Sequence, residues 1–238
     1  MVSKNIVLVH GWGADVEKLA PLSRSFKKEG WNVFVPKLPG FDLVSPRVAW
    51  GTGEYAEYVW EKAQKHFSGG RFFLFGHSFG GRIVIKLAAK YQKGLPGIVL
   101  CATGGISRAN PVKRGIFFVL AKMGKIFLVL PAVSGIWQTV LYKLAREHDY
   151  EKAKGIMREV FKKVVSKNAL QDLQEISIPT LVLWGRKDRM TKVEDAYEIT
   201  KKVKGSELFV FENEGHRLPY REPDRVVEQI NTWAKKIH

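Results

Sequence analysis

The feature that most constrains this chain is a serine set between glycines, where an apolar run meets a helix-like stretch. The segment is Gly76-His77-Ser78-Phe79-Gly80-Gly81. It follows the strand-like run 71–75 and opens the stretch 79–92, whose apolar residues recur at helical spacing. A G-x-S-x-G pattern in this setting predicts a tight, strained turn that presents the serine hydroxyl at a helix N-terminus. We therefore predict that Ser78 is a nucleophile.

A serine nucleophile needs a base, and we assign that role to His216, one of six histidines. It lies in a loop between the last strand-like run, 207–211, and the last helical stretch, 221–236. His77 adjoins the nucleophile, so we expect its side chain to be directed away from the serine. His216 is therefore the predicted base.

The base needs an orienting carboxylate, and Asp188 is the predicted one. It lies in a short loop after the strand-like run 180–184. Asp195 is the fallback, less favoured because it falls inside the helical stretch 193–203. The chain order serine, aspartate, histidine is the order expected of a strand–turn–helix nucleophile on a parallel sheet.

A second glycine-rich turn, His10-Gly11-Trp12-Gly13, follows the first strand-like run. We predict that the backbone N–H groups of Trp12 and Phe79 bind the oxyanion of a tetrahedral intermediate. Neither glycine-rich turn has the spacing of a phosphate-binding loop. We expect no metal and no cofactor.

Short apolar runs alternate with helical stretches along most of the chain. This alternation predicts an α/β fold, a mostly parallel sheet of about six strands with helices on both faces. The predicted strands are 5–10, 32–36, 71–75, 97–101, 180–184 and 207–211, and the helices are 16–29, 54–66, 79–92, 193–203 and 221–236.

One long connection breaks the alternation. Residues 103–177 contain no good strand run but hold a very apolar helical stretch, 115–142, and an amphipathic one, 144–173. We predict a helical cap (lid) at 103–177 over the carboxyl edge of a core domain formed by 1–102 and 178–238. The predicted substrate pocket combines core and cap residues, namely Trp12, His77, Phe117, Phe127 and Trp137.

Composition bounds the setting of the chain. The length of 238 residues suits one domain with an insertion, and the single Cys101 allows no internal disulfide. The start has no signal-peptide pattern, and the longest uncharged stretch is too interrupted for a membrane span. We therefore expect a cytoplasmic protein.

The formal net charge is +16. No nucleic-acid-binding signature accompanies it, so we expect no nucleic acid partner. Residues 104–175 hold 13 Lys or Arg against 6 Asp or Glu, which is nearly double the charge density of the remainder. An anionic membrane surface or an acidic carrier protein docking on the basic cap is the functional hypothesis, and a general lysine bias is the alternative.

Together these motifs resemble the α/β-hydrolase superfamily, in particular its small capped carboxylesterases and carbon–carbon bond hydrolases. The resemblance also includes Leu38-Pro39-Gly40-Phe41 and covers the chain outside the cap. It implies an α/β-hydrolase fold whose cap is inserted after the family's sixth strand. The family's first β-hairpin has no counterpart here, which predicts a fully parallel sheet. Serine at the elbow disfavours the dehalogenases and epoxide hydrolases of the superfamily, which carry aspartate there.

The sequence thus predicts a serine hydrolase of small-molecule carboxylic esters with short to medium acyl chains, acting through an acyl-enzyme. Hydrolysis of a carbon–carbon bond in a vinylogous diketone is one alternative. A methyl ester esterase acting on an acyl chain linked to a carrier protein is another, suggested by a resemblance in the His-Gly-Trp-Gly turn. A catalytically silent ligand receptor on the same scaffold is the non-enzyme alternative. The oligomeric state is left open.

Overall fold

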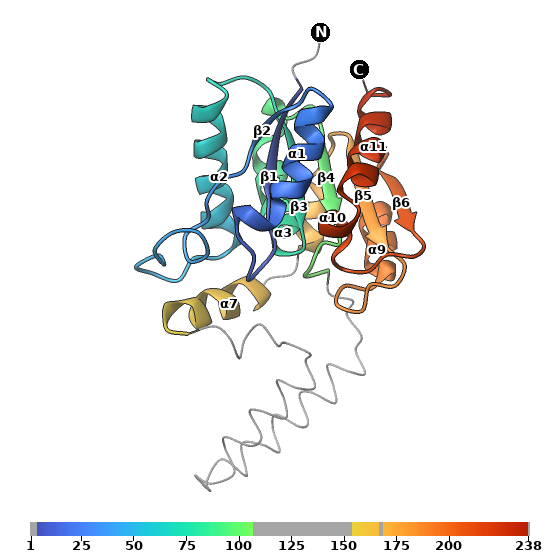
Figure 1. The fold of residues 1–238 in the computed structure, drawn as a ribbon. Coiled ribbons are helices and arrows are strands. Elements are labelled where there is room, and N and C mark those ends of the chain that lie inside the picture. The colour runs from blue at the N-terminus through green and yellow to red at the C-terminus, as the bar shows by residue number, and fades with distance from the viewer. Residues whose placement is uncertain (1–3, 107–153, 167–168, 238) are drawn as a thin grey trace, which may run out of the picture.

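The computed structural model describes residues 4–106, 154–166 and 169–237. Within them, six strands form one sheet in the order β2-β1-β3-β4-β5-β6, and every neighbouring pair is parallel. The predicted parallel sheet is confirmed (Figure 1). The strands are β1 (Asn5–Val9), β2 (Asn32–Phe34), β3 (Phe73–His77), β4 (Ile98–Cys101), β5 (Thr180–Gly185) and β6 (Glu207–Phe211).

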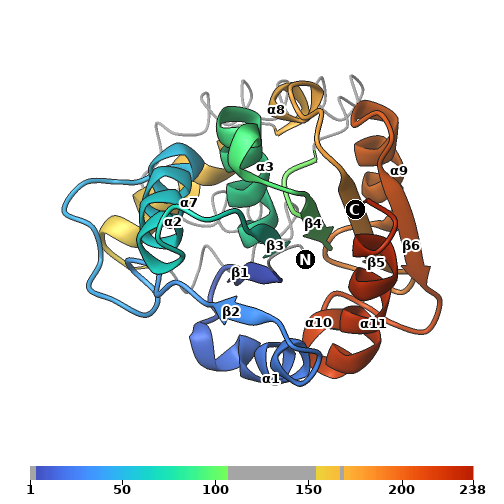
Figure 2. The ribbon, with the colours of Figure 1, turned by 90° about the horizontal axis from the view of Figure 1, so that it is seen from above.

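Helices cover both faces of this sheet (Figure 2). On one face lie α1 (Ala20–Lys28), α10 (Leu218–Arg221) and α11 (Pro223–Ala234), and on the other lie α2 (Thr52–His66), α3 (Phe79–Tyr91), α8 (Leu170–Gln174) and α9 (Val193–Lys202). The central strands β3, β4 and β5 are buried along their whole length. Their sequences are apolar almost throughout because both faces of the sheet are covered.

Two predicted helices are divided in the structure, and proline marks both divisions. The stretch 16–29 is a 3₁₀ turn, Val16–Leu19, followed by α1, in whose first turn Pro21 lies. The stretch 221–236 begins later, at Pro223, because a short α10 precedes it. Proline starts helices readily, since the first residues of a helix need no N–H partner. A further 3₁₀ turn, Gln92–Gly94, follows α3.

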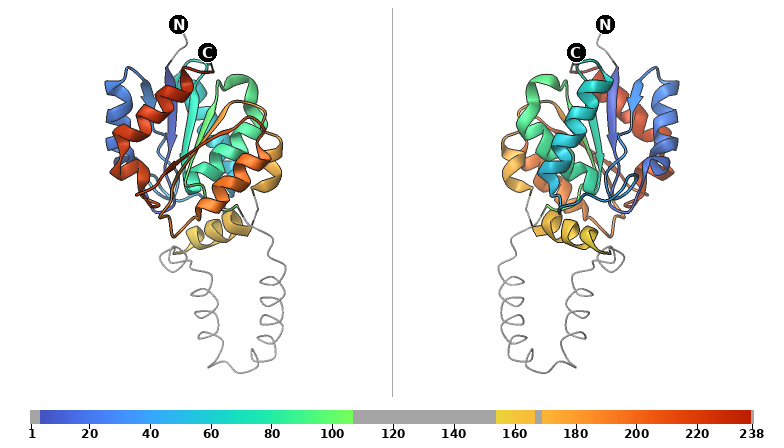
Figure 3. Two further views of the ribbon diagram at one scale, coloured as in Figure 1. Left: turned by 90° about the vertical axis from the view of Figure 1, so that its right-hand side faces the viewer. Right: turned by 90° about the vertical axis from the view of Figure 1, so that its left-hand side faces the viewer.

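Part of the predicted cap is described. Helix α7 (Ile156–Ser166) lies across the carboxyl ends of the strands, as Figure 3 shows from two sides. Val160 and Val164 of α7, and Leu173 and Ile176 further on, belong to the same buried apolar cluster as the sheet residues. Phe117, Phe127 and Trp137 lie outside the described residues, as does the predicted helix 115–142. The division into core and cap stays a prediction.

Parallel pairing has one consequence for function. The residues that follow β1, β3, β5 and β6 all emerge at the same edge of the sheet, the edge on which α7 lies. Ligands of open parallel sheets bind at this carboxyl edge. No helix in the described part of the chain is long and apolar enough to cross a membrane.

Candidate active site

The turn between β3 and α3 holds Ser78 in a strained backbone conformation, with φ 53° and ψ −112°. Two glycines make this turn possible because neighbouring backbone leaves no room for a side chain. A Cβ on Gly76 would lie 2.5 Å from the carbonyl oxygen of Gly80, and one on Gly80 would lie 2.2 Å from that of Val9. A non-glycine residue at positive φ is uncommon and costs about 1–3 kcal/mol. The predicted elbow is therefore present in the structure.

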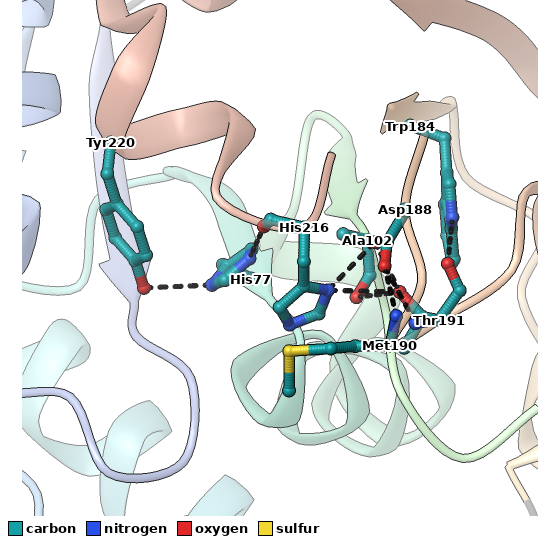
Figure 4. A network of polar contacts seen from close by, with 8 residues as sticks. All are labelled: His77, Ala102, Trp184, Asp188, Met190, Thr191, His216 and Tyr220. Carbon is teal, nitrogen blue, oxygen red and sulfur yellow. Dashed lines mark hydrogen bonds and ion pairs between the residues drawn. The ribbon is translucent and has the colours of Figure 1, made fainter. Parts of the chain in front are cut away.

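The loops after β5 and β6 bring an acid and a base together. Nδ1 of His216 lies 2.8 Å from Oδ2 of Asp188, whose side chain is fully buried (Figure 4). Burial opposes the charge on Asp188, but hydrogen bonds from His216 and Thr191 outweigh it, and the pKa of Asp188 is lowered. The charged carboxylate is thus held against the imidazole. Asp195 lies in the first turn of α9.

Thr191 holds the carboxylate from the other side. Its hydroxyl donates to Oδ2 of Asp188 at 2.8 Å and also lies 3.2 Å from the carbonyl of Ala102 and from Nδ1 of His216. The backbone N–H groups of Met190 and Thr191 donate to Oδ1 at 2.8 and 2.9 Å. Trp184 anchors this loop, because its indole N–H donates to the Thr191 carbonyl (Figure 4).

The two loops are also tied directly to each other. The N–H of Lys187 donates to the carbonyl of Glu214 at 2.8 Å, and a Cβ on Gly185 would lie 2.4 Å from the same oxygen. Arg186 adds a two-bond ion pair to Glu212, with distances of 3.1 and 2.9 Å. These contacts fix the separation of the loops that carry Asp188 and His216.

The turn 10–13 packs beside the elbow through an aromatic cluster. The Trp12 ring makes edge-to-face contacts with Phe41, Phe79 and Phe161, with centroid separations of 5.0, 5.4 and 5.0 Å. Phe161 comes from α7, so the segment predicted to form a cap contributes to this aromatic wall. His10 is fully buried and lies 3.0 Å from Asp42, whose carboxylate also accepts from the N–H of Leu38. Asp42 thus fastens the turn to the loop after β2.

His77 lies beside Ser78, but both of its ring nitrogens are engaged. Nε2 lies 2.8 Å from the carbonyl oxygen of His216, and Nδ1 lies 2.9 Å from the hydroxyl of Tyr220 (Figure 4). Burial, with the nearby charge of His216, lowers the pKa of His77 to about 3. A neutral imidazole whose two nitrogens are both bonded is not free to take a proton from Ser78.

A pocket of about 200 Å³ opens at the nucleophile. Ser78, His216, His77, Tyr220, Gly11 and Trp12 line it, together with the exposed side chains of Lys18 and Arg217. Within the described residues, Nε2 of His216 has no hydrogen-bond partner. The predicted nucleophile and base therefore share one pocket, and Asp188 stands behind the base.

Thr191, Tyr220 and Phe161 are among the residues of this site that the sequence predictions lack. The sequence did carry a signal for Thr191, which lies three residues after Asp188 in a turn. Hydroxyl side chains at such positions commonly form hydrogen bonds within the turn. Tyr220 and Phe161 had no such signal, because their contacts join segments that lie 143 and roughly 150 positions apart along the chain.

Comparison with known proteins gives a consistent family. A model of the alpha/beta hydrolase family matches residues 6–229. The proline iminopeptidase of Saccharolobus solfataricus is 26% identical, covering 99% of this chain and 86% of its own. A 2-hydroxy-6-oxononadienedioate/2-hydroxy-6-oxononatrienedioate hydrolase of Burkholderia vietnamiensis is 26% identical, with 97% and 87% covered. The solved structure of a thermophilic esterase from Thermogutta terrifontis has a TM-score of 0.69 at 25% identity, covering 98% and 90%.

Proposed function

The chain belongs to the alpha/beta hydrolase family, and from that premise we propose that it is a serine hydrolase of carboxylic esters. The observation that carries the proposal is the strained Ser78 elbow opening into the same pocket as the Asp188-backed His216. A hydroxyl needs a neighbouring base to attack a carbonyl, and that base needs an orienting partner.

In the proposed mechanism, His216 takes the proton of Ser78 as the oxygen attacks the ester carbonyl. Asp188 holds the imidazole and stabilises its charged form. His216 then gives the proton to the leaving alcohol and later activates the water that releases the acyl group. Because Nδ1 of His216 is bound to Asp188, Nε2 is the nitrogen that exchanges the proton.

The N–H groups of Trp12 and Phe79 are the proposed oxyanion donors. In residues 4–106, 154–166 and 169–237, neither group is paired with an acceptor. Phe79 is the first residue of α3, so no earlier turn of the helix offers it one. Two unpaired donors beside a nucleophile suit a developing negative charge.

The pocket favours an ester over a peptide that carries a free amino group. Trp12 joins the pocket to an aromatic wall that suits an apolar acyl group. Its described lining contains two cations, Lys18 and Arg217, and no carboxylate, which disfavours a peptide with a free amino group. The same two cations favour an anionic substrate, so cleavage of a carbon–carbon bond in an acidic vinylogous diketone remains the second candidate.

The test is the Ser78→Ala variant in a series of p-nitrophenyl esters of increasing acyl length. We expect hydrolysis by the unchanged protein, best with short to medium chains, and a fall in kcat of about 10³-fold or more in the variant. A vinylogous diketone assayed in parallel separates the two candidates.

A fluorophosphonate probe distinguishes an enzyme from a silent receptor. We expect labelling at Ser78 in the unchanged protein and none in Ser78→Ala. Full esterase activity in the alanine variant, or no labelling of the folded protein, would show the assignment to be wrong.

We further propose that the protein docks on an anionic membrane surface. The loop 43–48 holds three of the six exposed large apolar side chains of the described residues: Leu43 at 43%, Val44 at 91% and Val48 at 68%. Helix α7 runs beside this loop, with Lys163 donating to the carbonyl of Ala49. Exposed apolar residues next to basic ones on a chain of charge +16 fit an anionic bilayer better than an acidic carrier protein.

A further inference from the structure

Two partly buried hydrogen bonds in series connect the elbow to the loop that carries the proposed base. They join His77 of the elbow, His216 of the loop after β6 and Tyr220 of the short helix α10. The distances are 2.9 Å from Tyr220 to Nδ1 of His77, and 2.8 Å from Nε2 of His77 to the carbonyl of His216. Gly11 of the turn after β1 packs against the same imidazole.

The direction of both hydrogen bonds follows from the His216 carbonyl and from the neutral state of His77. The His216 carbonyl can only accept, so Nε2 of His77 carries the proton. His77 is neutral, so its Nδ1 is a bare acceptor and the Tyr220 hydroxyl donates to it. No member can reverse its role without breaking a bond.

The residues that these contacts join adjoin the proposed catalytic groups. Gly11 precedes Trp12, the proposed oxyanion donor, and the accepting carbonyl belongs to His216, the proposed base. His77 itself precedes Ser78. Gly11 also packs closely on the elbow, since a Cβ there would lie 3.2 Å from Nδ1 of His77 and 3.3 Å from Cβ of Ser78.

We propose that His77 and Tyr220 are positioning residues that hold the oxyanion turn and the base in register with Ser78. The inference rests on the proposed function. It gives His77 a role different from a substrate-pocket contact, although its ring lines the pocket wall. Tyr220 is the key member, because its hydroxyl holds the His77 ring whose Nε2–H binds the His216 carbonyl.

The test is Tyr220→Phe, which removes only the hydroxyl. Loss of register by a fraction of an ångström lowers catalysis far more than binding, so we expect kcat to fall about 10- to 100-fold while KM changes less than about twofold. The rate of fluorophosphonate labelling at Ser78 should fall in parallel.

The matched control is Tyr55→Phe. The Tyr55 hydroxyl is buried and donates to the carbonyl of Pro39 at 2.9 Å, but it has no part in the hydrogen bonds that run from Tyr220 to His216. We expect both variants to lose similar thermal stability and only Tyr220→Phe to lose kcat. If the two variants have equal kcat, the positioning role is wrong even though the esterase proposal stands.

His77 supplies a second and graded readout. His77→Gln retains a side-chain N–H donor and should keep more activity than His77→Ala. Nitrogen NMR of the unchanged protein should show His77 as the neutral Nε2–H form from pH 5 to 9. A titrating His77, or a Gln variant no better than Ala, would overturn the inference. Failure of the unchanged protein to hydrolyse esters or label would instead overturn the proposed function, and this inference with it.

Discussion

Asp188 shows at the scale of one residue how a site is held ready. It accepts two backbone N–H groups, the Thr191 hydroxyl and the His216 ring, so all of its bonding capacity is directed. Its pKa is lowered, so the stability that its charge adds is present at neutral pH, above the unfolded-state value. That stability is lost as the pH falls through the lowered value.

Replacing Asp188 and Asp195 in turn distinguishes the two candidate carboxylates. In Asp188→Asn we expect kcat to fall about 10³- to 10⁴-fold, because an amide no longer holds the imidazole in the productive form. Asp195→Asn should change kcat less than about twofold. Steady-state kinetics of the two variants with one p-nitrophenyl ester decide the matter, and comparable losses in both would contradict the assignment of Asp188.

The turn between β3 and α3 is constrained at the scale of the element by close backbone contacts. Gly80 touches the carbonyl of Val9 on the neighbouring strand, and Gly81 packs on the side chain of Thr103. The glycines therefore allow the elbow, β1 and the segment after β4 to pack closely, and they also allow the strained φ of Ser78. Backbone cannot yield as a flexible side chain can, so even one methyl group is too large here.

A pair of glycine substitutions tests this explanation. Gly80→Ala should lose about 3 kcal/mol of unfolding free energy, the upper end for an overpacked core. Gly53→Ala in α2, where a Cβ meets nothing within 4 Å, should instead gain roughly 0.5–1 kcal/mol from helix propensity. Urea unfolding measures both, and a neutral Gly80→Ala would show that the elbow is looser than described.

The formal net charge of the whole molecule, +16, is unusual, and most of its basic residues exceed what the described ion pairs involve. Described pairs such as Lys163 with Glu54 consume few of the 39 basic residues. In that pair, burial opposes the charge on Glu54, but Lys163 and backbone donors outweigh it and lower its pKa to about 2. The excess positive charge is not neutralised within the protein, so it attracts the protein to an anionic surface.

Vesicle binding tests the proposed membrane docking. We expect sedimentation with anionic vesicles at low salt, little with zwitterionic ones, and steep loss towards 0.5 M salt as charges are screened. The double variant Val44→Ser, Val48→Ser should bind about tenfold more weakly, whereas Tyr197→Ser, exposed on α9, should not. Binding to an acidic carrier protein but not to vesicles would contradict the proposal.

Much of the fold and of the candidate site was predictable from sequence. Strand–helix alternation specified a parallel sheet, and parallel pairing placed Ser78, Asp188 and His216 at one edge without any knowledge of contacts. The proposed catalytic residues carry local signals, such as glycines around a strained turn. These signals can be recognised in the sequence because a turn is formed by consecutive residues.

Only the tertiary structure decided how the site is braced. His77 was visible in the sequence, but its bonds to Tyr220 and to the His216 carbonyl join positions 143 and 139 apart. Likewise the bond from His216 selects Asp188 over Asp195, a choice that the sequence could rank but not make. The physical reason is that local backbone preferences act over a few residues, whereas a hydrogen bond between distant segments exists only after the sheet has brought them together.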